Sequence, residues 1–182
     1  MAVETGTRTL IAGVGYRNLR DLSAGNAIID ALLEKDWPAS VEIEDLSYGP
    51  MDAIFRFKES GFGRLIVIGA VARPGRIPGE VYRSRWRYAA EAPELVQARV
   101  AEAVTGVISL DNLLVICAHF EVLPSDTTVI EIEPENGDWG EEFSPRVARA
   151  SERIVAQLSA KWGGSEGSGH TRRLESGAGE TT

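Results

Sequence analysis

The sequence has few of the side chains that bind transition metals. It contains one cysteine and two histidines among 182 residues. A single cysteine cannot build an intramolecular disulfide framework, and zinc sites draw their ligands mainly from cysteine and histidine. His170 lies in a Gly- and Ser-rich segment, which leaves His119 as the one histidine of the predicted fold. Disulfide scaffolds and most zinc sites are therefore excluded.

Long apolar runs and an excess of positive charge are absent too. No apolar run approaches the roughly 20 residues of a membrane-spanning helix, and residues 1–9 lack the basic and then apolar layout of a secretory signal. Lys and Arg number 19 against 27 Asp and Glu, so the formal net charge is -8. Nucleic-acid binding needs a cationic footprint. These absences favour a cytoplasmic protein that binds neither a membrane nor nucleic acid.

Alternating strand and helix patterns predict the fold class. Strands are predicted at 9–14, 41–44, 65–68 and 128–132, with a further one indicated at 79–82, and helical spacing marks 24–33, 51–58, 95–104, 110–120 and a segment from Ser144. Two of the strands, 41–44 and 128–132, alternate with acidic residues and are expected nearer an edge. This order predicts an α/β fold: a single three-layer domain with a twisted, mostly parallel five-stranded sheet and helices on both faces.

The composition changes after Lys161, where Gly, Ser, Glu and Thr predominate. Such a segment cannot bury enough apolar surface to offset the entropy of ordering it. We therefore predict an α/β domain at residues 1–161 and a disordered Gly/Ser-rich tail at 162–182.

Two aspartates at the predicted carboxyl edge of the sheet are the candidate catalytic residues. In open parallel sheets, ligands bind beyond the carboxyl ends of the strands. Asp45 ends the second strand, and Asp21 follows the Gly13-Val14-Gly15 turn that closes the first. Both also have a structural interpretation, because Asp21 could cap the helix that begins at Leu22, and two carboxylates alone make a poor metal site.

Other patterns indicate weaker candidates. A dinucleotide-binding loop would need a third glycine where Asn18 stands, and no P-loop lysine follows. His119 and Cys117 belong to an apolar helical segment, so packing is the expected role of both, with an unreactive thiol.

One stretch departs from the overall acidity. Arg83 and Arg85 alternate with aromatic residues, Trp86 among them, between residues 73 and 88. The alternation could mark the solvent face of an exposed strand. Arginine beside aromatic side chains also suits recognition of a partner protein. Arg83, Arg85 and Trp86 are therefore the candidate partner-binding residues.

The motifs from about Leu10 to Leu158 resemble the hydrogenase maturation proteases, which trim the C-terminus of the nickel–iron hydrogenase large subunit after nickel is installed. The matching pieces are the glycine-rich stretch 11–25, the strand and turn at 41–49, the apolar strand 65–70, the Pro-Gly step at 78–81 and the strand 129–135. The resemblance implies a twisted five-stranded sheet between helices. It also implies a nickel–iron hydrogenase large-subunit precursor, or another hydrogenase component, as the partner.

The family's three metal-ligand positions fall on Leu22, Gly69 and Gly106 in this sequence. Leucine and glycine side chains cannot coordinate a metal. No cofactor is therefore expected in the free protein. Nickel is expected only where a substrate subunit carries it. Two functions stay open. One is an endopeptidase in which Asp21 and Asp45 support hydrolysis, and the other is a non-catalytic assembly factor or chaperone that binds a hydrogenase subunit.

Overall fold

A five-stranded sheet forms the centre of the molecule in the computed structural model, which describes residues 7–87, 89, 91–103 and 108–163. The strands are β1 (Thr9–Val14), β2 (Val41–Asp45), β3 (Arg64–Ala70), β4 (Val81–Arg85) and β5 (Asp126–Ile132), in the order β2-β1-β3-β5-β4. All neighbouring strands are parallel except β4, which pairs antiparallel with β5. The predicted mostly parallel five-stranded sheet is confirmed.

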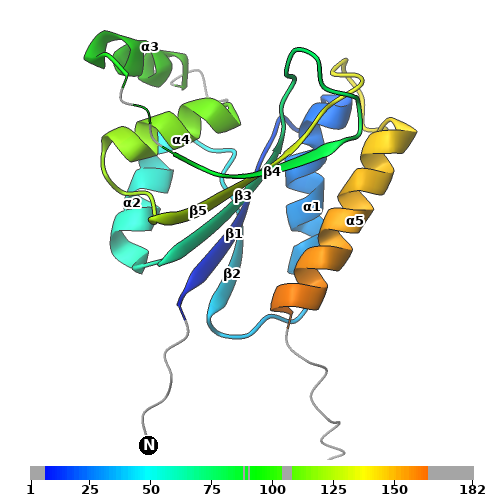
Figure 1. Cartoon of the computed structure of the whole chain (residues 1–182), viewed down its shortest axis with the longest axis horizontal. Coiled ribbons are helices and arrows are strands. Elements are labelled where there is room, and N and C mark those ends of the chain that lie inside the picture. Colours follow the sequence, from blue (N-terminus) through cyan, green and yellow to red (C-terminus); the bar gives the residue numbers. More distant parts are fainter. Residues whose placement is uncertain (1–6, 88, 90, 104–107, 164–182) are drawn as a thin grey trace, which may run out of the picture.

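Helices cover both faces of this sheet (Figure 1). They are α1 (Ala24–Leu33), α2 (Pro50–Ser60), α3 (Pro93–Ala103), α4 (Leu110–His119) and α5 (Pro145–Trp162), and a short 3-10 turn, η1 (Arg20–Ser23), precedes α1. α1 and α5 lie on one face and α2 and α4 on the other, while α3 lies outside α4 and contacts it. The predicted three-layer α/β architecture is thus present.

Side-chain alternation along the central strands builds the core on both faces. β1 is buried at every residue. Leu10 and Ala12 pack in a cluster with residues of α2 and α4, whereas Ile11 packs with residues of α1 and α5. Because successive strand residues point to opposite faces, a nearly continuous apolar strand serves both helix layers.

Several predicted boundaries shift in the structure. The strand indicated at 79–82 is β4, which lies at Val81–Arg85. It begins later than expected because Gly79 adopts a φ of 80° in the turn that precedes it. β2 is an edge strand as predicted, but β5 has β4 outside it. Residues 95–120 contain two helices, and Gly106 lies outside the described residues, as do residues 164–182 of the predicted tail. Among the helices described, none is long and apolar enough to cross a membrane.

Candidate functional site

A pocket of about 170 Å³ lies where β1 and β3 end at the carboxyl edge of the sheet. Its wall is mainly apolar and includes Leu22, Ala70, Val71 and Leu110. In the sheet, β2 is the neighbour of β1 on one side and β3 is its neighbour on the other, so the strand order reverses at β1. Such a reversal of strand order is where α/β sheets generally bind ligands. This pocket is therefore the candidate site.

The residues around this pocket do not fit a resident metal ion. Leu22 lines the pocket with an aliphatic side chain. A Cβ added at Gly69 would lie 3.0 Å from the backbone oxygen of Val14 and 3.3 Å from Leu110 Cδ2, so a carboxylate there would need its neighbours to move. The third predicted position, Gly106, lies outside the described residues. Within the described ranges, no three His, Cys, Asp or Glu side chains are grouped to hold a metal.

Asp111 lines the pocket, but both of its carboxylate oxygens are engaged by Arg73. The guanidinium nitrogens Nη1 and Nη2 donate to Asp111 at 2.8 and 2.7 Å. Arg73 also pairs with Glu131, and Arg76 donates to Glu131 Oε2 at 2.6 Å. The hydrogen bonds that Arg73 donates to Asp111 are the main cause that raises the pKa of Arg73, against the effect of burial. The carboxylates at this end of β5 and α4 are thus held in ion pairs.

Asp21 is a fully buried side chain that joins distant segments of backbone. Its Oδ2 accepts the N–H groups of Glu135 and Asn136 at 2.9 and 2.8 Å, and its Oδ1 accepts that of Ser144 at 2.7 Å. None of these donors belongs to α1, so the prediction that Asp21 caps that helix is wrong. The carboxylate secures the loop from β5 to α5 instead. Its exposure is 0%, so it does not contact solvent in this structure. A catalytic role for Asp21 stays a prediction.

Asp45 lies at the end of β2 and is held by three different donors. Its Oδ1 accepts the Ser47 N–H at 2.9 Å, and its Oδ2 accepts Asn26 Nδ2 and Arg17 Nη2, each at 2.9 Å. Burial disfavours the charged form, but hydrogen bonds from Ser47, Asn26 and Arg17 outweigh it and lower the pKa of Asp45. A carboxylate stabilised in this way is a weak base at neutral pH. A catalytic role for Asp45 stays a prediction.

Replacing Asp45 with asparagine is expected to lower the free energy of unfolding at pH 7 by about 1–3 kcal/mol, because the amide presents an N–H₂ group to donors. Since folding lowers the pKa, the carboxylate stabilises the fold above the 3.8 of an ordinary aspartate, and this contribution is lost as the pH falls through the folded-state value. Urea unfolding of wild type and Asp45→Asn, from pH 7 down to acidic pH, measures the difference in the free energy of unfolding. This difference should become smaller as the pH falls.

The control for this substitution is Asp30→Asn. Asp30 also pairs with Arg17, but its side chain is 52% exposed. Exposed ion pairs contribute about 0–1 kcal/mol. An equal loss of stability in the two variants, or a gap between wild type and Asp45→Asn that stays constant down to the most acidic pH, would contradict the assignment.

Cys117 and His119 lie on α4, away from the pocket. Cys117 is buried, and burial raises the pKa of its thiol to about 12, in agreement with the predicted unreactive cysteine. His119 is exposed at the end of α4 and stacks edge-to-face on Phe120 with ring centroids 5.5 Å apart, so the expectation that it is packed is wrong. The pocket is at the opposite end of this helix, which starts at Leu110.

The three candidate partner-binding residues do not share one face of β4. Arg83 is exposed and contacts Gln157 of α5. Arg85 is 63% exposed and lies 3.7 Å from Asp126. Trp86 is partly buried and packs against the core cluster of α2 and α4 on the other side. The two arginines and the tryptophan therefore point to opposite faces of the sheet.

Sequence reasoning missed the ion-pair network of Arg73, Arg76 and Glu131. Arg73 and Arg76 belong to the arginine-rich stretch whose pattern predicts an exposed strand or a partner-binding surface. The signal that could have found the network is Glu131 itself, an acidic residue between the apolar Ile130 and Ile132 of a predicted strand, which the structure buries. Glutamate is almost never fully buried unless it is paired, so a nearby arginine was to be expected.

Comparison with known proteins gives a consistent structural likeness. The chain is similar to an endopeptidase from Escherichia coli (TM-score 0.60, 24% identity, covering 85% of this chain and 94% of that one). It is also similar to the hydrogenase maturating endopeptidase HybD from E. coli (TM-score 0.57, 22% identity, 85% and 94%). A third similar structure is the nickel–iron hydrogenase maturation protease HybD from Thermococcus kodakarensis (TM-score 0.56, 24% identity, 86% and 99%).

No protein-family description and no curated protein sequence matches the chain. The likeness is therefore one of three-dimensional structure, and it spans nearly the whole described domain and nearly the whole of each similar structure. The protein has the fold of the hydrogenase maturation proteases.

Proposed function

We propose that this protein acts in the maturation of the nickel–iron hydrogenase large subunit by binding the precursor, or another hydrogenase component, without cutting it. The observation that carries the proposal is the pocket at the carboxyl edge of the sheet. It lies where sheets of this kind generally bind ligands, but Leu22, at one of the three metal-ligand positions that the resemblance gives, lines it with an aliphatic side chain, as do the apolar Ala70 and Leu110. A chain that keeps the fold without a metal-coordinating side chain at this position is suited to binding a partner protein.

The acidic residues near the pocket support the same proposal. Asp21 is buried among backbone donors, and Asp111 is paired with Arg73. Asp45 is held ionised by three donors, which leaves it a poor proton acceptor. Peptide hydrolysis needs a group that activates water or stabilises developing negative charge. Nickel enters this proposal only as cargo of the hydrogenase subunit, and the proposed compartment is the cytoplasm.

An endopeptidase is the second candidate function. The observation in its favour is Asp45, a carboxylate at the carboxyl edge whose side chain is 11% exposed. In that case Asp45 would act together with the metal carried by the substrate. If the protein is an endopeptidase, Asp45→Asn would abolish cleavage of the precursor. If the protein only binds the precursor, Asp45→Asn would leave that binding unchanged.

Co-purification tests the proposed association. The tagged protein, expressed beside the hydrogenase genes of its own organism, is expected to retain a large-subunit precursor or another hydrogenase component. We further propose that Arg83 and Arg85 contact this partner, with Trp86 supporting their strand from the core side. The Arg83→Ala/Arg85→Ala variant should recover less partner than wild type, and Lys58→Ala on α2 is the control. Recovery of no hydrogenase component by wild type would contradict the function.

A further inference from the structure

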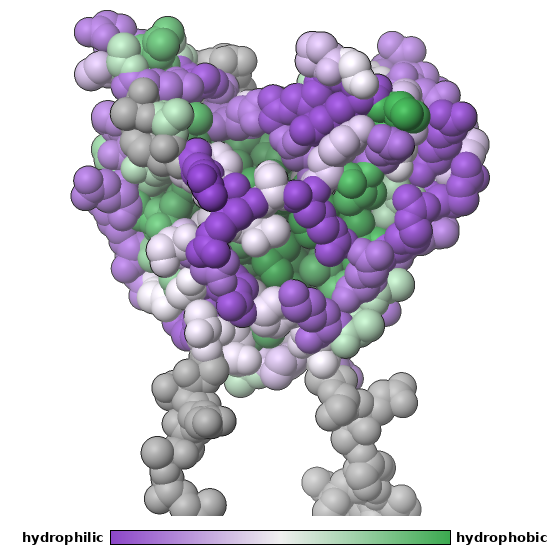
Figure 2. All heavy atoms as spheres, viewed as in Figure 1, coloured by the Kyte–Doolittle hydropathy of each residue, from purple (hydrophilic) through white to green (hydrophobic). Residues whose placement is uncertain are grey.

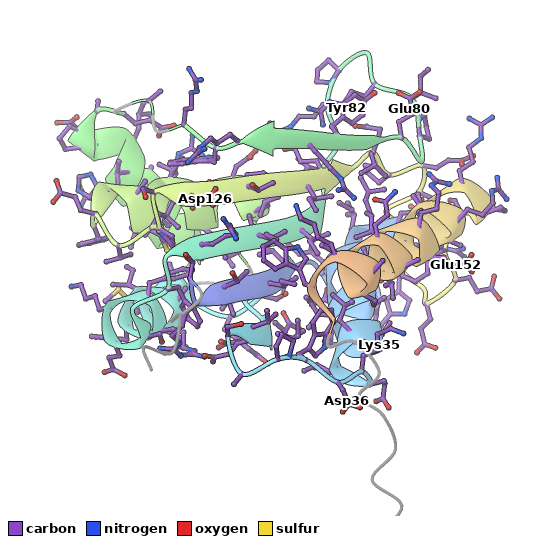
Figure 3. The ribbon with its side chains drawn as sticks, turned by 60° about the horizontal axis from the view of Figure 1, so that its bottom comes forward. Lys35, Asp36, Glu80, Tyr82, Asp126 and Glu152 are labelled. Atoms are coloured by element: carbon purple, nitrogen blue, oxygen red, sulfur yellow. The ribbon has the colours of Figure 1, made fainter. Side chains whose placement is uncertain are left out.

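A long groove separates α5 from strands β4 and β5 on one face of the sheet. Two adjoining cavities, of about 530 and 370 Å³, share Arg83 and Gln157 in their linings, and the hydrogen bond between these two side chains crosses the groove where the cavities meet. Glu80 and Asp126 mark its two ends in Figure 3. The groove lies apart from the pocket at the carboxyl edge, with which it shares no lining residue.

The groove exists because the sheet extends beyond its helices on this face. α5 contacts α1, while β4 adds a strand outside β5. The bottom of the groove is closed by the core side chains of Ile130, Ile154 and Leu158, which are only 1 to 3% exposed. Figure 2 shows apolar atoms in the depression between the strands and α5, bordered by hydrophilic side chains. Polar and charged side chains therefore supply most of the surface that a ligand in this groove would contact.

The rim of the groove carries more positive than negative charge. Arg153, Gln157 and Lys161 follow one another at intervals of four residues along α5, so they share one side of the helix. Arg83 faces them from β4. In the described part of the chain, no carboxylate lies within ion-pair distance of Arg83, Arg153 or Lys161.

The two acidic residues of the groove already have partners. Asp126 accepts from Arg64 Nε at 2.6 Å, and Glu80 accepts from the hydroxyl of Tyr82 at 2.6 Å. The cations of the groove lining, Arg64, Arg83, Arg153 and Lys161, outnumber these two carboxylates, so the groove has a net positive charge. A basic groove in a protein with a formal net charge of -8 is a local reversal of sign, and such reversals steer oppositely charged partners.

We propose that this groove binds an extended acidic segment of a partner protein. Residues 153 and 161 are separated by about 12 Å along the helix at its standard rise, which is about four residues of extended chain. The expected ligand thus carries carboxylates four residues apart, to meet Arg153 and Lys161. This inference does not rest on the proposed hydrogenase function.

A labelled peptide, Glu-Val-Glu-Val-Glu with blocked ends, tests the groove directly. Wild-type protein is expected to bind it saturably in a fluorescence anisotropy titration at low salt, and not to bind Lys-Val-Lys-Val-Lys. The Arg153→Glu/Lys161→Glu variant should bind at least about tenfold more weakly, because two attractive pairs become repulsive. Lys35→Glu/Lys58→Glu makes the same change of net charge outside the groove and should bind within about twofold of wild type.

Thermal unfolding of each variant verifies that the fold is retained, and both altered positions on α5 are exposed. Absence of saturable binding by wild type would overturn the proposal, as would equal weakening in the two double variants. Binding that appears only when the chain is shortened to end at Gly163 would show that its own C-terminal segment occupies the groove. A wild-type dimer that dissociates in Arg153→Glu/Lys161→Glu would assign the groove to a second copy.

Discussion

Replacing Asp21 with alanine is expected to lower the free energy of unfolding by about 3–5 kcal/mol. The substitution removes the acceptor of three backbone N–H groups, those of Glu135, Asn136 and Ser144. These donors lie around a side chain with no solvent exposure, so water reaches them poorly. Urea unfolding at pH 7 measures the loss.

The matched control is Asp36→Ala, which removes an exposed carboxylate and should change stability by no more than about 0.5 kcal/mol. Asp21→Asn separates the charge from the packing, because it retains one acceptor oxygen and nearly the same volume. It should fall between wild type and the alanine variant. A loss below about 1 kcal/mol in Asp21→Ala would mean that the aspartate does not secure this loop.

The second large effect is expected at Gly25, in the first turn of α1. A Cβ added there would lie 2.2 Å from the backbone oxygen of Val14 and 2.8 Å from that of Ile68. In an ordinary exposed helix, Gly→Ala stabilises by about 1 kcal/mol. Here the new atom would meet the ends of β1 and β3, whose backbone cannot move without disturbing the sheet. Gly25→Ala should therefore destabilise by about 3 kcal/mol or more, in line with overpacked core sites.

Gly49→Ala is the control for this substitution. Gly49 precedes α2, and a Cβ there meets nothing within 4 Å. Its cost should stay below about 1 kcal/mol. If calorimetry showed Gly25→Ala to be as stable as wild type, α1 would not approach the sheet as closely as the structure has it.

The same contacts explain the glycine-rich turn after β1 without a phosphate ligand. A Cβ at Gly13 would lie 2.4 Å from the backbone oxygen of Gly25, and one at Gly15 would lie 2.4 Å from Asn26 Oδ1. The glycines allow α1 to lie directly against the end of β1. This packing function is sufficient to account for a Gly-x-Gly pattern that lacks the third glycine of a dinucleotide-binding loop.

The sequence predicts the layers of this fold well because apolar periodicity is a local property. β1 and β3 have nearly continuous apolar runs and are the buried central strands. The role of Asp21 could not be predicted in this way, because its acceptor oxygens meet N–H groups 114 to 123 residues further along the chain. The Arg73–Glu131 pair, 58 residues apart, was hidden for the same reason.

The candidate site shows a similar division. Sequence alignment by motif identified Leu22 and Gly69 as positions without ligand side chains, and the structure places Leu22 in the pocket and Gly69 against Leu110. The pairing of Asp111 with Arg73 depends on how α4 meets the loop after β3, and no local pattern encodes that contact. Ion pairs between residues of different helices, strands and loops could therefore be identified only in the three-dimensional structure.

The most direct test of the central claim is the intact mass of a nickel-loaded hydrogenase large-subunit precursor after incubation with this protein. A protein that binds without cutting leaves the precursor at its full mass while forming a complex that elutes earlier in gel filtration. We expect that result for wild type and for Asp45→Asn alike. A precursor shortened at its C-terminus by wild type, and left intact by Asp45→Asn, would contradict the account and establish the protein as an endopeptidase.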